Sequence, residues 1–159
     1  MTMSGRRNGD SHVRNVITQD IKDTGDFFMK TTIPVALDET LQTKTIEQVK
    51  SIDGLEIMVI KPTVLGGIEA SYQLIQKAHA VGMSTVISSC YESSIGILGL
   101  ANLAGASSRH QGAGLDTLKW FKADVLLEPV AISHGKMSIE RPPVKAEQIN
   151  FTILNEVPV

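Results

Sequence analysis

Cysteine is almost absent from this sequence, and aromatic residues are few. Of 159 residues one is a cysteine, Cys90, and 4% are aromatic. A single cysteine excludes an intramolecular disulfide and the paired CxxC motifs of zinc and redox sites, which fits a reducing compartment. We therefore expect Cys90 to behave as a small buried hydrophobic residue.

The sequence also lacks an excess of one charge and a long apolar run. Fifteen basic residues against seventeen acidic ones give a formal charge of -2, and neither sign is gathered into a block. This balance argues against a nucleic-acid or polybasic membrane surface and favours a small-molecule or protein partner. No apolar run approaches the roughly 20 residues of a membrane-spanning helix, and the polar start does not read as a secretory signal. We expect a soluble protein.

What the sequence does contain is a regular alternation of strand and helix patterns. Short apolar runs predict strands at 33–38, 55–61, 84–89 and 112–117, and helical spacing or composition predicts helices at 39–54, 68–82, 92–107 and 118–124. Such alternation is typical of parallel βα units. An open doubly wound sheet and a (β/α) barrel both satisfy it.

The two ends of the chain differ from this middle part. Residues 1–30 form a polar segment that we expect to be partly disordered, and 31–140 form the α/β part. Within it, 128–140 reads as an antiparallel hairpin about a His-Gly turn. Residues 141–159 predict an irregular, peripheral tail.

Polar residues stand at the end of every predicted strand, which is the edge where α/β folds place their chemistry. The strands run into Asp38-Glu39, into Lys61, into Ser88-Ser89 before Glu92-Ser93-Ser94, and into Asp116. Each has an ordinary structural explanation: the acids can cap helices, Lys61 can extend to water, and Gly66-Gly67 can supply turn conformations. His79 and His110 have no metal-ligand spacing, and we expect them to be structural or exposed.

Four motifs in this order carry a resemblance to a known family: "PVALDET", "VIKPTVLGG", "VISSCYESSIG" and "GLDTLKWFKADV". Over 33–139 the chain resembles the C-terminal barrel half of o-succinylbenzoate synthase, in the enolase superfamily. The last motif looks especially like the synthase module of a plant multifunctional protein of phylloquinone biosynthesis. The resemblance implies four βα units of a (β/α) barrel, located in the chloroplast if the protein is plant-like and otherwise in the cytoplasm.

The resemblance also implies roles for individual residues. Asp38 matches the third of three carboxylates that bind Mg²⁺, and Lys61 matches the lysine whose charge stabilises the enediolate. The substrate would be a small-molecule carboxylate, a succinyl-hydroxycyclohexadiene carboxylate that is dehydrated to o-succinylbenzoate in menaquinone or phylloquinone biosynthesis. The positions matched to its binding are Gly66, Gly67, Ser88, Ser89, Glu92, Ser93, Ser94 and Asp116.

The chain departs from the family pattern in what precedes residue 33. The family's base, the second lysine of Lys-x-Lys, and two metal carboxylates lie on earlier strands, and we expect none of those strands here. This predicts half an active site and three outcomes: a homodimer of half-barrels, a complex with a chain that carries the missing half, or a truncated product. The alternative function is a non-catalytic relic or a structural, partner-binding domain. Another dehydratase or racemase of the superfamily fits less well.

Overall fold

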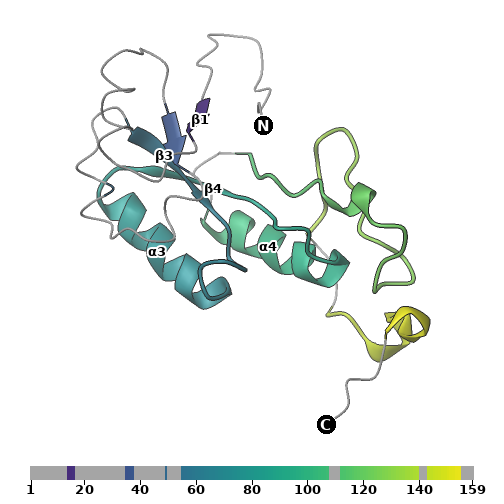
Figure 1. Ribbon diagram of the computed structural model, residues 1–159. Coiled ribbons are helices and arrows are strands. Elements are labelled where there is room, and N and C mark those ends of the chain that lie inside the picture. Colours follow the sequence, from purple (N-terminus) through teal and green to yellow (C-terminus); the bar gives the residue numbers. More distant parts are fainter. Residues whose placement is uncertain are drawn as a thin grey trace.

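A parallel four-stranded sheet forms the centre of the described part of the chain (Figure 1). The computed structural model describes residues 14–16, 35–37, 49, 55–107, 112–139 and 143–154. Neighbouring strands pair in parallel in chain order. The strands are β1 (Arg14–Val16), β2 (Val35–Leu37), β3 (Leu55–Ile60) and β4 (Ser84–Ile87).

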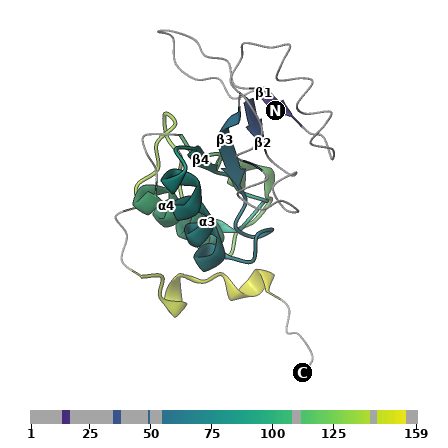
Figure 2. The same ribbon diagram turned by 90° about the vertical axis from the view of Figure 1, so that its left-hand side faces the viewer.

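Two helices cover one face of this sheet and lie side by side in both views (Figures 1 and 2). Helix α3 (Ile68–Ala80) turns an apolar stripe inward, with Ile75 and Ala78 fully buried. Helix α4 (Ser94–Ser107) is rich in small and apolar residues and packs against α3 and β4. The core lies between sheet and helices, where Met58 and Ile60 meet residues of both helices.

The opposite face of β3 is less covered. Side chains alternate along a strand, so Ile57 and Val59 point away from the face of Met58 and Ile60. Both are half-buried, whereas Met58 and Ile60 are almost fully buried. This is the face that a closed barrel would turn toward its interior.

The parallel order continues beyond β4. Ser88 and Gly114 form a parallel bridge, in which the Gly114 N–H donates to the Ile87 carbonyl at 2.8 Å and the Ser89 N–H donates to the Gly114 carbonyl at 3.0 Å. Parallel strands beginning near 33, 55 and 84 are therefore confirmed, whereas the strand predicted at 112–117 is present only as a single bridge at Gly114. The predicted helix at 118–124 is shorter than expected, because only the 3₁₀ turn η2 (Leu118–Trp120) forms.

Strand β1 was not predicted. It lies in the segment expected to be polar and partly disordered, and it pairs in parallel with β2 through Asn15 and Ala36. The sheet therefore extends one strand further toward the N-terminus than the sequence indicated. β1 carries neither Lys-x-Lys nor a carboxylate, so it is not one of the family strands expected to be missing. It forms because pairing with a neighbouring strand can impose extended structure that local sequence does not favour.

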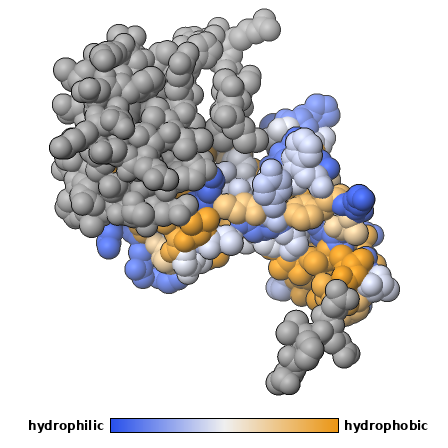
Figure 3. Space-filling model, viewed as in Figure 1, coloured by the Kyte–Doolittle hydropathy of each residue, from blue (hydrophilic) through white to orange (hydrophobic). Residues whose placement is uncertain are grey.

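The C-terminal segment is more closely attached than predicted. It forms the 3₁₀ turns η3 (Ala146–Gln148) and η4 (Phe151–Ile153), and Ile149 makes an antiparallel bridge with Leu126. Val144 packs against a small cluster of Leu98, Leu126 and Val130. Hydrophobic residues gather over these turns in Figure 3. Phe151, in η4, has an exposed fraction of 61%.

The hairpin predicted about the His-Gly turn is present as a tight turn. Ser133 and Lys136 exchange two backbone hydrogen bonds of 2.9 Å. Both central residues, His134 and Gly135, have positive φ, as a two-residue hairpin turn of this type requires. The predicted helix at 39–54 lies outside the described residues except for Val49, which is helical and buried. Among described helices, none is long and apolar enough to cross a membrane.

Candidate active site

The carboxyl ends of β3 and β4 and the residue Gly114 form a row at one edge of the sheet. Lys61 directly follows β3, and Ser88 directly follows β4. The Ser88 N–H donates to the Ile60 carbonyl at 2.9 Å, so the parallel pairing continues to this point. Lys61 is half-buried and continues the alternation of Ile57 and Val59. Backbone pairing thus brings Lys61, Ser88 and Gly114 to one edge of the sheet; that their side chains form one site with Asp38 and Asp116 stays a prediction.

The turn between Lys61 and α3 is built around the Lys61 backbone. The Lys61 carbonyl accepts hydrogen bonds from Val64 N–H at 3.0 Å and Leu65 N–H at 3.1 Å. Gly66 and Gly67 have φ of 92° and 106°, which other residues rarely adopt. No side chain of the described residues caps α3, so its first-turn N–H groups are available to an anion.

The turn after β4 is held by side-chain contacts. The Glu92 carboxylate accepts from the Thr63 hydroxyl through Oε1 and from the Cys90 N–H at 2.6 Å through Oε2. Ser89 is buried; its hydroxyl donates to the Gly114 carbonyl at 3.1 Å and lies 3.0 Å from the Thr117 hydroxyl. The predicted substrate residues Ser89 and Glu92 therefore make contacts within the protein itself.

Ser94, at the start of α4, also makes hydrogen bonds within the protein. Its N–H donates to Asp124 Oδ2 at 3.0 Å, and its fully buried hydroxyl accepts from Val130 N–H at 3.1 Å. Asp124 also accepts from Leu126 N–H at 3.0 Å. These contacts favour a structural role for Ser94. Sequence reasoning missed Asp124 because a cap from 30 residues away leaves no local signal.

Asp116 and Ser93, two further predicted substrate residues, also contact neighbours within the protein. The Asp116 carboxylate lies 2.5 Å from Lys119 Nζ, and both side chains are more than half exposed. The Lys119 ammonium stands 5.9 Å from the Trp120 ring centroid. The carbonyl of Ser93 accepts from Ile97 N–H at 2.8 Å, as expected at the beginning of a helix.

The two histidines were expected to be structural or exposed. His79 Nε2 lies 3.0 Å from the Thr85 hydroxyl, which supports a structural role. His110 lies outside the described residues.

The predicted metal ligand, Asp38, follows the last residue of β2 and lies outside the described residues. Within the described ranges, no three His, Cys, Asp or Glu side chains come together in a group that could hold a metal ion. The described residues thus do not form a magnesium site. Asp38 stays a prediction.

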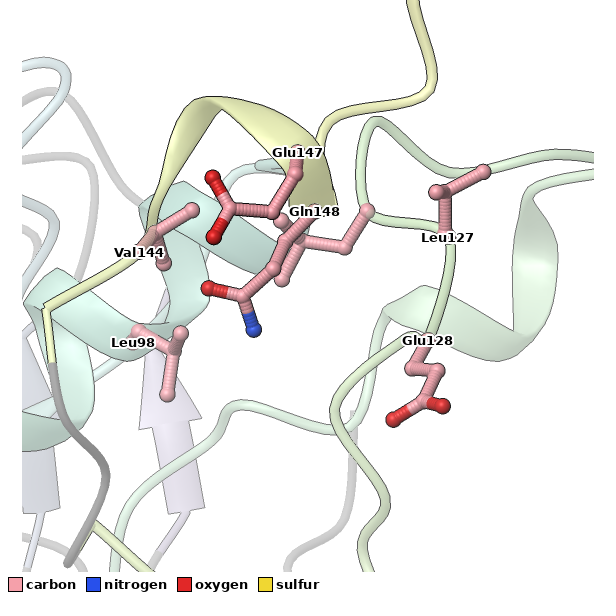
Figure 4. A pocket seen from close by; sticks show the side chains of 7 residues that line it. Leu98, Leu127, Glu128, Val144, Glu147 and Gln148 are labelled. Carbon is pink, nitrogen blue, oxygen red and sulfur yellow. The ribbon is translucent and has the colours of Figure 1, made fainter.

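Two recesses lie beside α4. The first, of about 290 Å³, is shown in Figure 4 between Leu98 and the C-terminal residues Val144, Glu147 and Gln148. The second, of about 450 Å³, lies between the later part of α4 and the hairpin and has Asp116 in its wall. Lys61 lines neither recess.

Known proteins are similar to part of this chain in sequence. The o-succinylbenzoate synthase of Aliivibrio salmonicida is 41% identical over 97 residues, which are 61% of this chain and 30% of that protein. This chain resembles o-succinylbenzoate synthase. The resemblance drawn from the four motifs is confirmed. The synthases of Aliivibrio salmonicida, Aliivibrio fischeri and Yersinia pseudotuberculosis are bacterial, so the plant likeness stays a prediction. No protein-family model matches the chain.

Solved structures show the same fold. MenC from Desulfotalea psychrophila superposes with a TM-score of 0.61 at 24% identity, covering 72% of this chain and 33% of that one. Muconate lactonizing enzyme from Pseudomonas putida gives 0.63 at 22% identity, over 76% and 34%. The described sheet and helices thus share the fold of part of these two proteins. The chain spans about a third of the length of the synthases and structures that it matches.

Proposed function

We propose that this chain supplies the C-terminal barrel part of an o-succinylbenzoate synthase and is active when a chain with the first half completes the barrel. The observation that carries this proposal is the row of Lys61, Ser88 and Gly114 at one sheet edge, in a chain 41% identical to a synthase over 97 residues. The reaction is dehydration of a succinyl-hydroxycyclohexadiene carboxylate to o-succinylbenzoate.

Lys61 is the catalytic residue in this proposal. Its ammonium would stabilise the negative charge that develops as the α-proton leaves the substrate, because a positioned charge acts most strongly where charge forms in the transition state. Its position at the end of β3, continuing the less covered face of Ile57 and Val59, supports a role in the barrel mouth. The base that takes the proton would come from the completing chain.

Binding of the substrate carboxylates falls to the turns beside Lys61. The uncapped first turn of α3 offers backbone N–H donors after Gly66 and Gly67, and helix N-termini attract anions. Ser88 and Ser93, both half-buried at the same edge, are the hydroxyls best placed to assist. Mg²⁺ belongs to this proposal through Asp38, whose carboxylate suits a hard cation; the role of Lys61 does not depend on it.

The test is a pair of turnover assays. The isolated chain, given excess Mg²⁺ and the synthase substrate, should show no product absorbance, because it lacks the family's base. Addition of a chain carrying the first half of a related barrel should give turnover. Turnover by the isolated chain would reveal a substitute base and contradict half-site complementation. An assembled but inactive complex would instead support the non-catalytic reading.

A further inference from the structure

The side chain of Glu92 joins two turns that are far apart in sequence. One oxygen accepts from the hydroxyl of Thr63, 29 residues earlier, and the other accepts from Cys90 N–H. Thr63 lies in the turn after β3 and Cys90 in the turn after β4. One carboxylate therefore fastens the two strand ends that carry Lys61 and Ser88.

The surrounding backbone accommodates this carboxylate at two places. A Cβ on Gly96 would lie 2.6 Å from Glu92 Cβ and 3.1 Å from its Cγ, so only glycine at position 96 leaves room for the side chain as it stands. Tyr91 lies between Cys90 and Glu92, whose N–H and Oε2 are 2.6 Å apart, and has a φ of 64°. A bulky residue rarely adopts this conformation and needs support from its neighbours to hold it.

The turn fastened in this way is the one built on Lys61. The Lys61 carbonyl accepts from Val64 and Leu65, the residues directly after Thr63. Holding Thr63 therefore restricts the peptide units from which the Lys61 side chain extends. A small displacement of a catalytic group lowers rate strongly, by about 10²-fold for 1 Å.

We propose that Glu92 is a positioning residue, which acts through Thr63 and Cys90 to hold the Lys61 turn against the turn after β4. This differs from the substrate contact that the resemblance implied for Glu92. Each carboxylate oxygen already accepts a hydrogen bond from the protein, and an anionic substrate would repel the same carboxylate. The effect on Lys61 chemistry rests on the proposed function, whereas the tie between the turns does not.

Thr63 provides the sharper variants because it is exposed and its loss leaves the core intact. Thr63→Val keeps the shape and removes the donor, while Thr63→Ser keeps the donor. In the isolated chain, amide exchange of Val64 and Leu65 should become about tenfold faster in Thr63→Val, the change expected for loss of one hydrogen bond. Thr63→Ser should exchange like the parent.

Glu92→Gln and the Thr63→Val/Glu92→Gln double variant complete a cycle. Thr63→Val removes the hydrogen bond between Thr63 and Glu92, and Glu92→Gln weakens it because the amide oxygen accepts without the carboxylate charge. The double variant should therefore exchange no faster than Thr63→Val. In the complemented barrel, Thr63→Val should lower kcat about tenfold or more and leave KM within about threefold.

Two results would overturn the proposal. One is amide exchange at Val64 and Leu65 that is unchanged in Thr63→Val. The other is a silent Thr63→Val combined with a Glu92→Gln that raises KM alone, which would make Glu92 a substrate contact. If complementation gives no turnover at all, the proposed function fails, and the exchange measurement still decides whether Glu92 holds the turn.

Discussion

Ser71 and Ser94 offer a prediction in which the same substitution has opposite effects. Both side chains are fully buried and both lie in the first turns of their helices. The Ser94 hydroxyl accepts a hydrogen bond from Val130 N–H. The Ser71 hydroxyl has no hydrogen-bond partner among the residues that the structure describes.

The expected magnitudes follow from these contacts. Ser94→Ala leaves the N–H of Val130, itself 7% exposed, without an acceptor, which typically costs about 1–3 kcal/mol. Ser71→Ala removes an unpartnered buried hydroxyl and places the best helix former in α3. We expect Ser71→Ala to raise the free energy of unfolding by about 0.5–1.5 kcal/mol. The two variants should therefore differ by about 1.5–4.5 kcal/mol.

Urea unfolding of the parent and both variants measures this difference. With a slope of about 1–3 kcal/mol per M, the midpoints of the two variants should move in opposite directions by readily measured amounts. An unchanged slope would show that the shift reports stability. If both substitutions lower the midpoint equally, the hydrogen-bond assignments of these two serines are wrong.

Two other substitutions test the contact of Asp124 with the start of α4 and the hairpin turn at Gly135. Asp124→Ala should lower the free energy of unfolding by about 2–4 kcal/mol, because the Asp124 carboxylate accepts from two backbone N–H groups. The control, Asp116→Ala, removes only an exposed ion pair and should lower it by less than about 1 kcal/mol. Equal losses in urea unfolding would contradict this difference. Gly135→Ala places a side chain at a φ of 70° and should cost about 1 kcal/mol, whereas no loss in the same assay would mean that the hairpin turn is not formed as described.

The sequence predicted the features that depend on local periodicity. Apolar runs followed by helical spacing placed β3, α3, β4 and α4 within a few residues of their observed bounds, because both patterns are read within about 15 residues. Since parallel strands end at one edge, the same pattern brought Lys61 and Ser88 together. The four motifs then identified the barrel type.

Features made by distant residues escaped prediction. Thr63 and Glu92 are separated by 29 residues, and Ser94 and Asp124 by 30, so each pair meets only because the fold brings them together. Strand β1 consists of three residues that gain extended structure from pairing with β2. These contacts give Glu92 and Ser94 partners within the protein, which the motif alone could not show.

Replacement of Lys61 in the complemented barrel tests the central claim most directly. Lys61→Ala should lower kcat about 10²–10³-fold with little effect on KM, the usual loss for a preorganised charge that acts in the transition state. Lys61→Arg should recover little, because the guanidinium differs in shape and reach. If the Lys61→Ala barrel assembles and turns over substrate as fast as the parent, Lys61 is only a strand end that reaches water, and the proposed catalytic role is contradicted.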